Sequence, residues 1–213
     1  MEISSAERVL VLAPHTDDGE LGAGATINKL KELGCEVKYV AFSIAEDSVS
    51  PEFPKDILAT EVLMATSQLG LSTEDVIVYR YPVRNLDKYR QEILEKLISI
   101  RKQYDPTVIF VPSTDDIHQD HEVISKEGVR AFKNRIVLGY ELPWNNFRFH
   151  SNFFFEVSKR NVENKILALG EYKTQKGRNY VGREFTFGQA KYRGVQAGLN
   201  FAEAFEVIRC VIK

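Results

Sequence analysis

The chain has 213 residues, enough for one sizeable domain, and its 44% apolar and 27% charged residues are ordinary for a globular protein. A formal net charge of −2 gives no electrostatic reason to expect nucleic acid as a partner. The sequence contains no apolar run long enough to span a bilayer, and its N-terminus lacks the pattern of a signal peptide. The two cysteines, Cys35 and Cys210, form no disulfide framework, so we expect reduced thiols and a cytoplasmic location.

Short apolar runs alternate with amphipathic segments along the first two thirds of the chain. Residues 8–13 are rich in branched side chains, as in a strand covered on both faces. Apolar residues then recur at helical spacing from 21 to 33, and Gly34 is a candidate C-terminal cap. The same reasoning predicts strands at 36–42, 76–79, 107–111 and 136–141, helices at 55–69, 87–104 and 121–132, and a loop at 46–54.

This alternation predicts an α/β fold: a Rossmann-like, mostly parallel sheet with helices on both faces, in three α/β/α layers. The C-terminal third is less regular. Its pattern predicts a strand at 153–157 and helices at 162–172 and 188–203. We find no repeat or linker, so residues 1–213 are predicted to form a single domain.

Two polar segments directly follow predicted strands. PHTDD follows the strand at 8–13, and STDDIHQDH follows the strand at 107–111. In open parallel sheets, ligands bind outside the carboxyl ends of the strands. We therefore expect the two segments to meet at one edge of the sheet, although roughly a hundred residues separate them.

The residue types in these segments favour metal-dependent hydrolysis, and the candidates are His15, Asp17, Asp18, His118 and His121. A catalytic zinc site needs three nitrogen or oxygen ligands and an open position for water. One imidazole and one carboxylate from the first segment, with one imidazole from the second, would supply them. A remaining carboxylate could take the proton from metal-bound water, and a remaining histidine could stabilise an oxyanion. These roles describe amide or ester hydrolysis.

Other interpretations compete with this one. An aspartate after a strand often caps the next helix, and loop histidines can simply be solvated. A nucleotide-binding protein using Gly22 and Gly24 is disfavoured, because no GxGxxG is present and two nearby carboxylates would repel a pyrophosphate. A further alternative is a protein that keeps a metal and binds sugar without catalysis. The presence of all five catalytic-type residues argues against it.

The two segments carry a resemblance to a known family. APHTDDGELGAGAT at 13–26 resembles the signature of the LmbE-like, or PIG-L-type, zinc-dependent N-deacetylases, and HQDH at 118–121 resembles that family's HxDH motif. Weaker similarity lies at 61–70, 101–112, 172–175 and 202–205. The resemblance therefore covers most of the chain, and the pairing of the two histidine motifs is its specific part.

The resemblance implies a role for each candidate. His15, Asp18 and His121 would bind Zn²⁺, with another divalent metal as an alternative. Asp17 would be the general base and later the acid that protonates the leaving amine. His118 would polarise the acyl carbonyl and stabilise the oxyanion.

Further residues match the family pattern in less direct ways. Asp120 would orient a ligand histidine or cap the following helix. Gly22 and Gly24 would let the first helix pack closely on the sheet. The resemblance assigns no role to three other residues: Glu20, Glu171 and Gln175.

The family chiefly removes the acetyl group from N-acetylglucosamine units, which implies a small N-acetylated sugar or glycoconjugate as partner. Sugar hydroxyls need directional polar contacts and sugar C–H faces pack on aromatic rings, so Arg84, Glu141 and Trp144 are candidate substrate contacts after strands. Leu58 stands where relatives often have an arginine near the substrate, so the substrate need not be that of the best-known members. A non-sugar N-acyl substrate stays an alternative, and the sequence leaves assembly as a homo-oligomer open.

Overall fold

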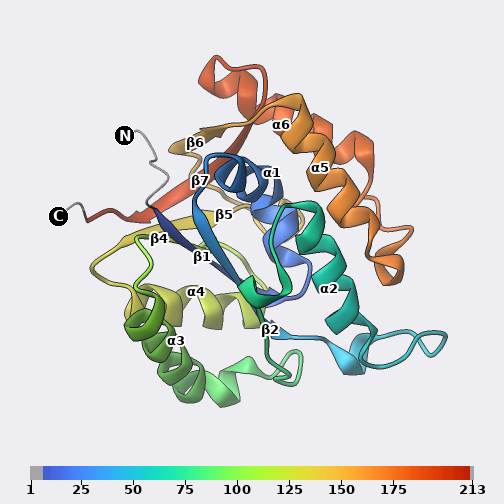
Figure 1. Ribbon diagram of the computed structural model, residues 1–213, viewed down its shortest axis with the longest axis vertical. Coiled ribbons are helices and arrows are strands. Elements are labelled where there is room, and N and C mark those ends of the chain that lie inside the picture. The colour runs from blue at the N-terminus through green and yellow to red at the C-terminus, as the bar shows by residue number, and fades with distance from the viewer. Residues whose placement is uncertain (1–6, 212–213) are drawn as a thin grey trace.

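A seven-stranded sheet forms the centre of the computed structural model, which describes residues 7–211 (Figure 1). The strands are β1 Arg8–His15, β2 Glu36–Ser43, β3 Val76–Val78, β4 Val108–Pro112, β5 Ile136–Tyr140, β6 Phe153–Glu156 and β7 Ala202–Arg209. Their order is β3-β2-β1-β4-β5-β7-β6; the first five are parallel, and β7 runs antiparallel to β5 and β6. The predicted mostly parallel α/β sheet is confirmed. Residues 1–6, part of the N-terminus in which no signal peptide was predicted, lie outside the described residues.

Helices cover both faces of the sheet. The α-helices of the described chain are α1 Asp18–Glu32, α2 Ile57–Gln68, α3 Arg90–Tyr104, α4 Gln119–Ala131, α5 Lys159–Gly170 and α6 Arg183–Ala197. Helices α1, α2, α5 and α6 lie on one face, and α3 and α4 lie on the other (Figure 1). Short 3-10 turns lie at Glu46–Ser48, Thr73–Asp75, Leu86–Tyr89 and Lys173–Gln175. Between residues 7 and 211, no helix is both long and apolar enough to cross a membrane.

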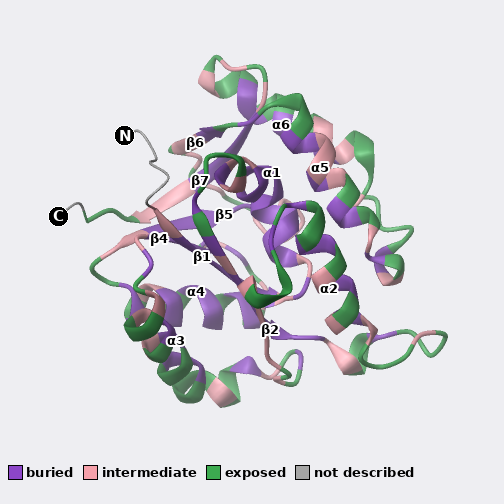
Figure 2. Cartoon of the chain, in the orientation of Figure 1, coloured by how far each residue is buried: buried purple, intermediate pink, exposed green. Residues whose placement is uncertain are grey.

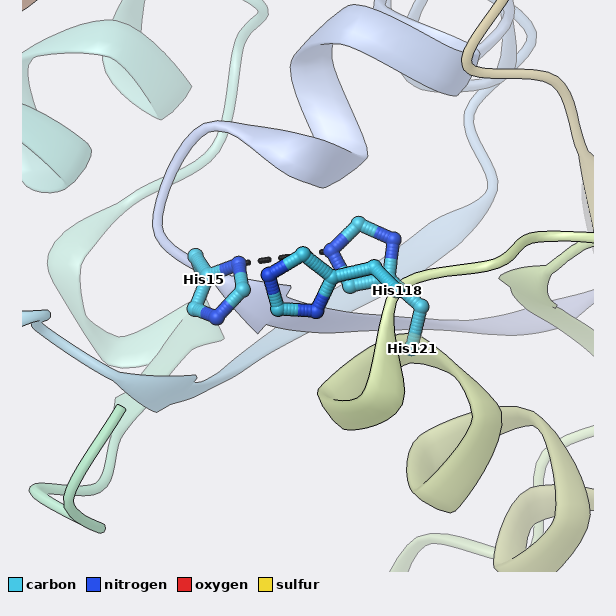
Figure 3. A group of neighbouring side chains, drawn as sticks. All are labelled: His15, His118 and His121. Atoms are coloured by element: carbon cyan, nitrogen blue, oxygen red, sulfur yellow. Dashed lines mark hydrogen bonds between the residues drawn. The ribbon is translucent and has the colours of Figure 1, made fainter. Parts of the chain in front are cut away.

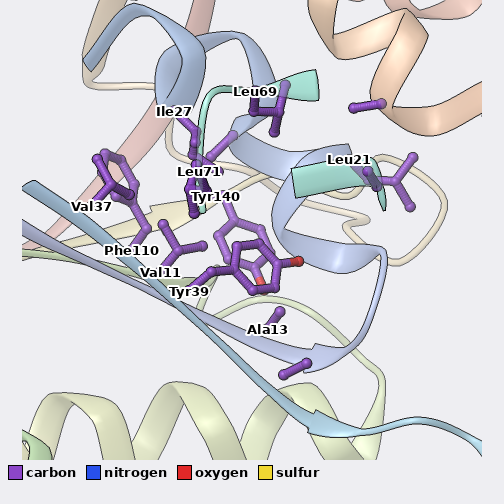
Figure 4. Close-up of a cluster of buried hydrophobic side chains, with 14 of the residues drawn as sticks. Val11, Ala13, Leu21, Ile27, Val37, Tyr39, Leu69, Leu71, Phe110 and Tyr140 are labelled. Carbon is purple, nitrogen blue, oxygen red and sulfur yellow. The ribbon is translucent and has the colours of Figure 1, made fainter. Parts of the chain in front are cut away.

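The central strand β1 contributes to two separate cores. Val9, Val11 and Ala13 pack in the core on the α1 and α2 side, whereas Leu10 and Leu12 pack in the core on the α3 and α4 side. All five side chains are fully buried, and Figures 2 and 4 show the buried interior and the first of the two cores. A strand covered on both faces needs an apolar residue at every position, which explains the unbroken apolar run in the sequence.

The six predicted helices are present, and each begins two to five residues from its predicted start. Gly34 and Gly70 follow α1 and α2 with φ values of 82° and 93°, the left-handed conformation that suits a helix terminus. The predicted helix at 87–104 starts as a 3-10 turn and becomes α-helical at Arg90. Helix α4 begins at Gln119, two residues before the predicted start, because His118 serves as its N-cap.

The predicted helix at 188–203 is wrong in its last part. Helix α6 ends before Gly198, which has a φ of 71°, and the chain then forms β7. Glu203 and Glu206 interrupt the apolar pattern that would indicate a strand. Their carboxylates are accommodated there because distant segments of the chain bind them. Glu206 accepts hydrogen bonds from Ser113 and Thr114 after β4, and Glu203 pairs with Lys165.

Glu203 and Lys165 together hold the middle of α1. The Lys165 ammonium donates to the Leu21 carbonyl and to Glu203 Oε1, both at 2.7 Å. The Glu203 carboxylate accepts the backbone N–H groups of Ala25 and Thr26 at 3.2 and 2.7 Å. Both charged side chains are buried. Side chains from α5 and β7 therefore satisfy backbone groups inside α1, and this fixes the helix that follows the PHTDD segment.

Two glycines let α1 approach its neighbours closely. A Cβ added to Gly22 would lie 2.3 Å from the Tyr140 ring on β5, so this glycine permits contact between α1 and the sheet as the resemblance implied. A Cβ added to Gly24 would instead lie 2.9 Å from the Lys165 side chain on α5. The expectation that Gly24 also faces the sheet is therefore wrong.

We expect Gly22→Ala to lower the free energy of unfolding by roughly 1–3 kcal/mol, because the new methyl group would overlap the fully buried Tyr140 ring. Gly188 is the matched control: it lies in α6, and a Cβ there would meet no atom within 4 Å. Gly188→Ala should leave stability unchanged or raise it by up to about 1 kcal/mol. Urea unfolding of both variants measures the difference, and equal effects would contradict the packing argument.

Candidate functional site

The two polar segments meet where the strand order changes direction. β1 lies between β2 and β4, so the chain leaves β1 toward one edge of the sheet and later returns to its other side. A crevice at such a point, outside the carboxyl ends of the strands, is the usual ligand site of an open parallel sheet. A pocket of about 510 Å³ lies there, and its lining includes all five predicted candidates: His15, Asp17, Asp18, His118 and His121.

Three potential metal-ligand atoms form a small triangle. His15 Nδ1 lies 3.1 Å from Asp18 Oδ2, His121 Nε2 lies 3.2 Å from the same oxygen, and the two nitrogens are 3.3 Å apart. Zinc bound tetrahedrally at about 2.0–2.1 Å separates neighbouring ligand atoms by roughly 3.3–3.4 Å. The donor types and their spacing therefore fit a divalent metal such as zinc.

Buried carboxylates orient both histidines of the triangle. His15 Nε2 lies 2.9 Å from Asp120 Oδ2, and His121 Nδ1 lies 2.7 Å from Asp116 Oδ2. Neither aspartate side chain has exposed surface. An imidazole that donates one N–H to a carboxylate presents the lone pair of its other nitrogen. The triangle is thus lined by electron pairs that a cation would satisfy.

Electrostatics favour positive charge at this point. Burial opposes the charged form of His15, but Asp18 and Asp120 outweigh it and raise the His15 pKa to about 9. Burial likewise opposes charge on His121, yet Asp18 and Asp116 raise its pKa to about 10. Although burial would raise the pKa of Asp18, the two histidines hold it well below its usual range. A bound metal would supply this charge in place of the protons.

Asp17 does not act as a capping side chain. It occupies the N-cap position of α1, but its carboxylate makes no capping hydrogen bond and instead lines the pocket. Burial and the neighbouring Asp18 raise its pKa to about 6. The Asp18 side chain is held by more contacts than that of Asp17, because its Oδ2 also accepts the backbone N–H of His15 at 2.8 Å.

His118 is held in one tautomer. Its Nδ1 accepts the backbone N–H of Asp120 at 3.2 Å, so in the neutral ring the proton belongs on Nε2. Burial, followed by His121 and His15, lowers the His118 pKa and favours that neutral ring. The three histidines lie together with ligand atoms within 4.8 Å of one another (Figure 3). The triangle that includes Asp18 is tighter, and it leaves His118 beside it as a hydrogen-bond donor.

A buried network supports the turn between β1 and α1. The hydroxyl groups of Tyr39 and Tyr172 lie 2.8 and 2.7 Å from the Thr16 carbonyl oxygen, and both also contact the Glu20 carboxyl group. Burial raises the pKa of Glu20 to about 8. Glu20 is fully buried beneath the turn. Tyr39 and Tyr172 lie in distant parts of the sequence, so local patterns could not reveal this support.

Two of the three predicted substrate contacts lie in the pocket. Arg84 and Trp144 line it, together with Gln175, for which the sequence assigned no role. Glu141 does not line it, because its buried carboxylate pairs with Arg193 of α6, whose Nε lies 3.0 Å away. Glu141 is therefore not brought into this pocket with the other candidates.

Sequence reasoning missed three further residues at the site. Asp116 orients His121; its only sequence signal was its place in STDDIHQDH, which it shares with Asp115. Arg178 and Tyr180 line the pocket from the loop before α6, and the Tyr180 ring stacks on Trp144 with centroids 3.9 Å apart. Nothing local in that loop sequence points to a site.

We expect Asp116→Ala to weaken metal binding roughly 10–100-fold, because it removes the carboxylate that orients His121 and accepts the backbone N–H of His118. Asp115→Ala is the matched control, since this neighbour is partly exposed and its ion-pair contact is with the exposed His150 at 3.7 Å. Titration with a competing chelator measures both affinities. Equal affinities for the two variants would remove Asp116 from the site.

Comparisons with known proteins identify similar sequences and similar folds. Among curated proteins, the uncharacterized deacetylase YaiS of Escherichia coli (strain K12) is 22% identical over 179 residues, covering 81% of this chain and 95% of that protein. The conserved protein TT1542 from Thermus thermophilus has a TM-score of 0.78 and 26% identity, with 96% of each chain covered. The N,N'-diacetylchitobiose deacetylase from Pyrococcus horikoshii has a TM-score of 0.75 and 19% identity, covering 95% of this chain and 84% of that one.

The family comparison covers both histidine motifs. The model of the PIG-L family, described as GlcNAc-PI de-N-acetylase, matches residues 10–132, which is more than half of the chain. The matched region begins within β1 and includes α1, β4 and all of α4, and therefore every side chain of the triangle. The chain belongs to the PIG-L, or GlcNAc-PI de-N-acetylase, family of deacetylases.

Proposed function

We propose that this protein is a metal-dependent N-deacetylase that removes the acetyl group from an N-acetylglucosamine-type sugar or glycoconjugate. The observation that carries the proposal is the triangle of His15, Asp18 and His121, with Asp17 and His118 beside it in one pocket. The family match supports deacetylation as the reaction, and the five side chains supply a complete set of groups for it.

His15, Asp18 and His121 would hold the metal, and zinc suits two imidazoles and a carboxylate. When bound, the metal supplies Lewis acidity, which polarises an acyl carbonyl and lowers the pKa of water. Asp116 and Asp120 keep the two imidazoles aimed at one point. Two layers of side chains would thus hold the metal.

The remaining side chains would move protons and stabilise charge. Asp17, with no capping contact to compete, would accept a proton from the attacking water and return it to the leaving amine. His118 would donate from Nε2 to the oxyanion, because its Nδ1 is taken by the Asp120 N–H. The Glu20, Tyr39 and Tyr172 network would keep the turn that presents Asp17 in place.

The pocket wall also offers a partner for a sugar hydroxyl. Gln175 Nε2 donates to Thr174 Oγ1 at 3.2 Å, and that hydroxyl is oriented by Glu61 at 2.7 Å. The Gln175 Oε1 atom is left buried without a hydrogen-bond partner among the described residues. Because Gln175 lines the pocket, we infer that a small shift of its side chain would let its amide group bind a sugar hydroxyl.

Acetate release from a panel of N-acetylated compounds tests the proposal. We expect the zinc-loaded protein to release acetate from N-acetylglucosamine derivatives, to lose activity after chelation and to regain it with added metal. Release only from non-sugar N-acyl compounds would favour the alternative of a zinc amidase. Sugar binding with no acetate released from any substrate would favour a metal-retaining binding protein.

A further inference from the structure

Two arginines line the pocket without a carboxylate partner. Arg84 follows β3 and Arg178 precedes α6, so they come from different parts of the chain. Within residues 7–211, neither forms an ion pair with a carboxylate within 4.0 Å, although many other arginines do. The carboxylates that line the pocket are Asp17 and Asp18, which belong to the site itself. The pocket lining therefore carries two guanidinium groups that no carboxylate among residues 7–211 pairs with.

The backbone of Arg84 is fixed to the site. Its φ of 63° is uncommon for a residue with a side chain, and such strain persists where surrounding contacts hold it. The Arg84 N–H donates at 2.6 Å to Asp120 Oδ2, the same oxygen that orients His15. The guanidinium group in turn donates to Ser48 Oγ, also in the pocket lining, at 3.2 Å. Arg84 is thus built into the site through one shared carboxylate.

Arg178 is anchored from another side. Its guanidinium group donates to the Tyr180 hydroxyl, and Tyr180 stacks on Trp144 with an interplanar angle of 18°. Arg178 and Asp17 line the same pocket. Both arginines therefore line the pocket that also contains Asp17.

We propose that Arg84 and Arg178 bind an anionic group, a phosphate or a carboxylate, carried by the N-acetylated sugar on which the protein acts. The inference rests on the proposed function and names its substrate class. Guanidinium groups bind both anions through charge-assisted hydrogen bonds. Both arginines are exposed, so water solvates them beside a neutral sugar, whereas an anionic sugar would gain charge-assisted hydrogen bonds from them.

A matched series of substrates tests the inference. N-acetylglucosamine is compared with its C6 carboxylate, its 6-phosphate and its 1-phosphate, with kcat/KM measured by acetate release. We expect at least one anionic form to exceed the neutral sugar. Arg84→Met and Arg178→Met should each reduce that advantage about tenfold or more, mainly through KM. Arg160→Met, an exposed arginine outside the pocket, is the control and should preserve the advantage.

The outcomes separate this inference from the proposed function. Equal kcat/KM for neutral and anionic sugars, or an advantage that survives both arginine substitutions, would overturn the inference and leave deacetylation intact. If no sugar releases acetate, calorimetric binding of the 6-phosphate and 1-phosphate to the Asp17→Asn protein decides. If these phosphates bind and the arginine substitutions abolish their binding, the inference stands and the proposed function is contradicted. If the phosphates bind equally well without the two arginines, or do not bind at all, the inference is overturned.

Discussion

Asp17→Asn should lower kcat roughly 10²–10⁴-fold while leaving the metal content of the protein unchanged. The asparagine keeps the shape of the side chain but cannot take up and return a proton. The side chain makes no capping hydrogen bond to α1, so this substitution removes no helix contact. Asp17 is also absent from the triangle of close donor atoms, so the metal ligands stay in place.

Asp18→Asn is the contrasting variant for this test. Asp18 Oδ2 lies within 3.2 Å of both ligand nitrogens, so its replacement should reduce metal content together with activity. Acetate release and elemental analysis are measured on both proteins. Unchanged turnover in the Asp17 variant would remove its assignment as base, and loss of metal in that variant would make it a ligand instead.

Lys165→Met should lower the free energy of unfolding by roughly 3–5 kcal/mol, because it leaves the Glu203 carboxylate buried without its cation. The substitution also removes the donor to the Leu21 carbonyl inside α1. The effect should reach the site, since α1 starts at Asp18. We therefore expect weaker metal binding as well as lower stability.

An exposed ion pair gives the control for this prediction. Lys126 and Glu122 pair on the surface of α4, with side-chain exposures of 65% and 54%. Lys126→Met should change stability by only about 0.3–0.5 kcal/mol, since solvent screens such a pair. Denaturant unfolding of both variants measures the contrast. A Lys165 effect as small as that of Lys126 would show that the buried pair does not hold α1.

Local patterns were sufficient for the parallel part of the fold. The apolar run in β1 has the composition of a strand with two buried faces, and glycines 34 and 70 mark the ends of two helices. β7 could not be found in this way. Its Glu203 and Glu206 look like surface residues until Lys165 and the segment after β4 are brought beside them. The missed strand is thus one whose polar residues depend on tertiary partners.

The same distinction applies to the site. The paired motifs, together with the expectation that strand ends meet, predicted which five side chains would come together, and the structure brings them into one pocket. Their roles stay proposals. Asp116, Tyr39 and Tyr172 were missed. Asp116 contacts His121 only once the turn before α4 has folded. Tyr39 and Tyr172 support the Thr16 carbonyl, which is far from both in the sequence. Glu141 lies outside the pocket lining and pairs with Arg193, a buried partner that its strand-end position does not reveal.

The most direct test of the account is an anomalous diffraction map of zinc-loaded crystals at the zinc absorption edge. We expect one strong peak at about 2.0–2.2 Å from His15 Nδ1, Asp18 Oδ2 and His121 Nε2, with Asp17 and His118 outside the ligand sphere. No peak at this triangle, or a peak bound through His118 in place of Asp18, would contradict the assignment of ligands and catalytic groups.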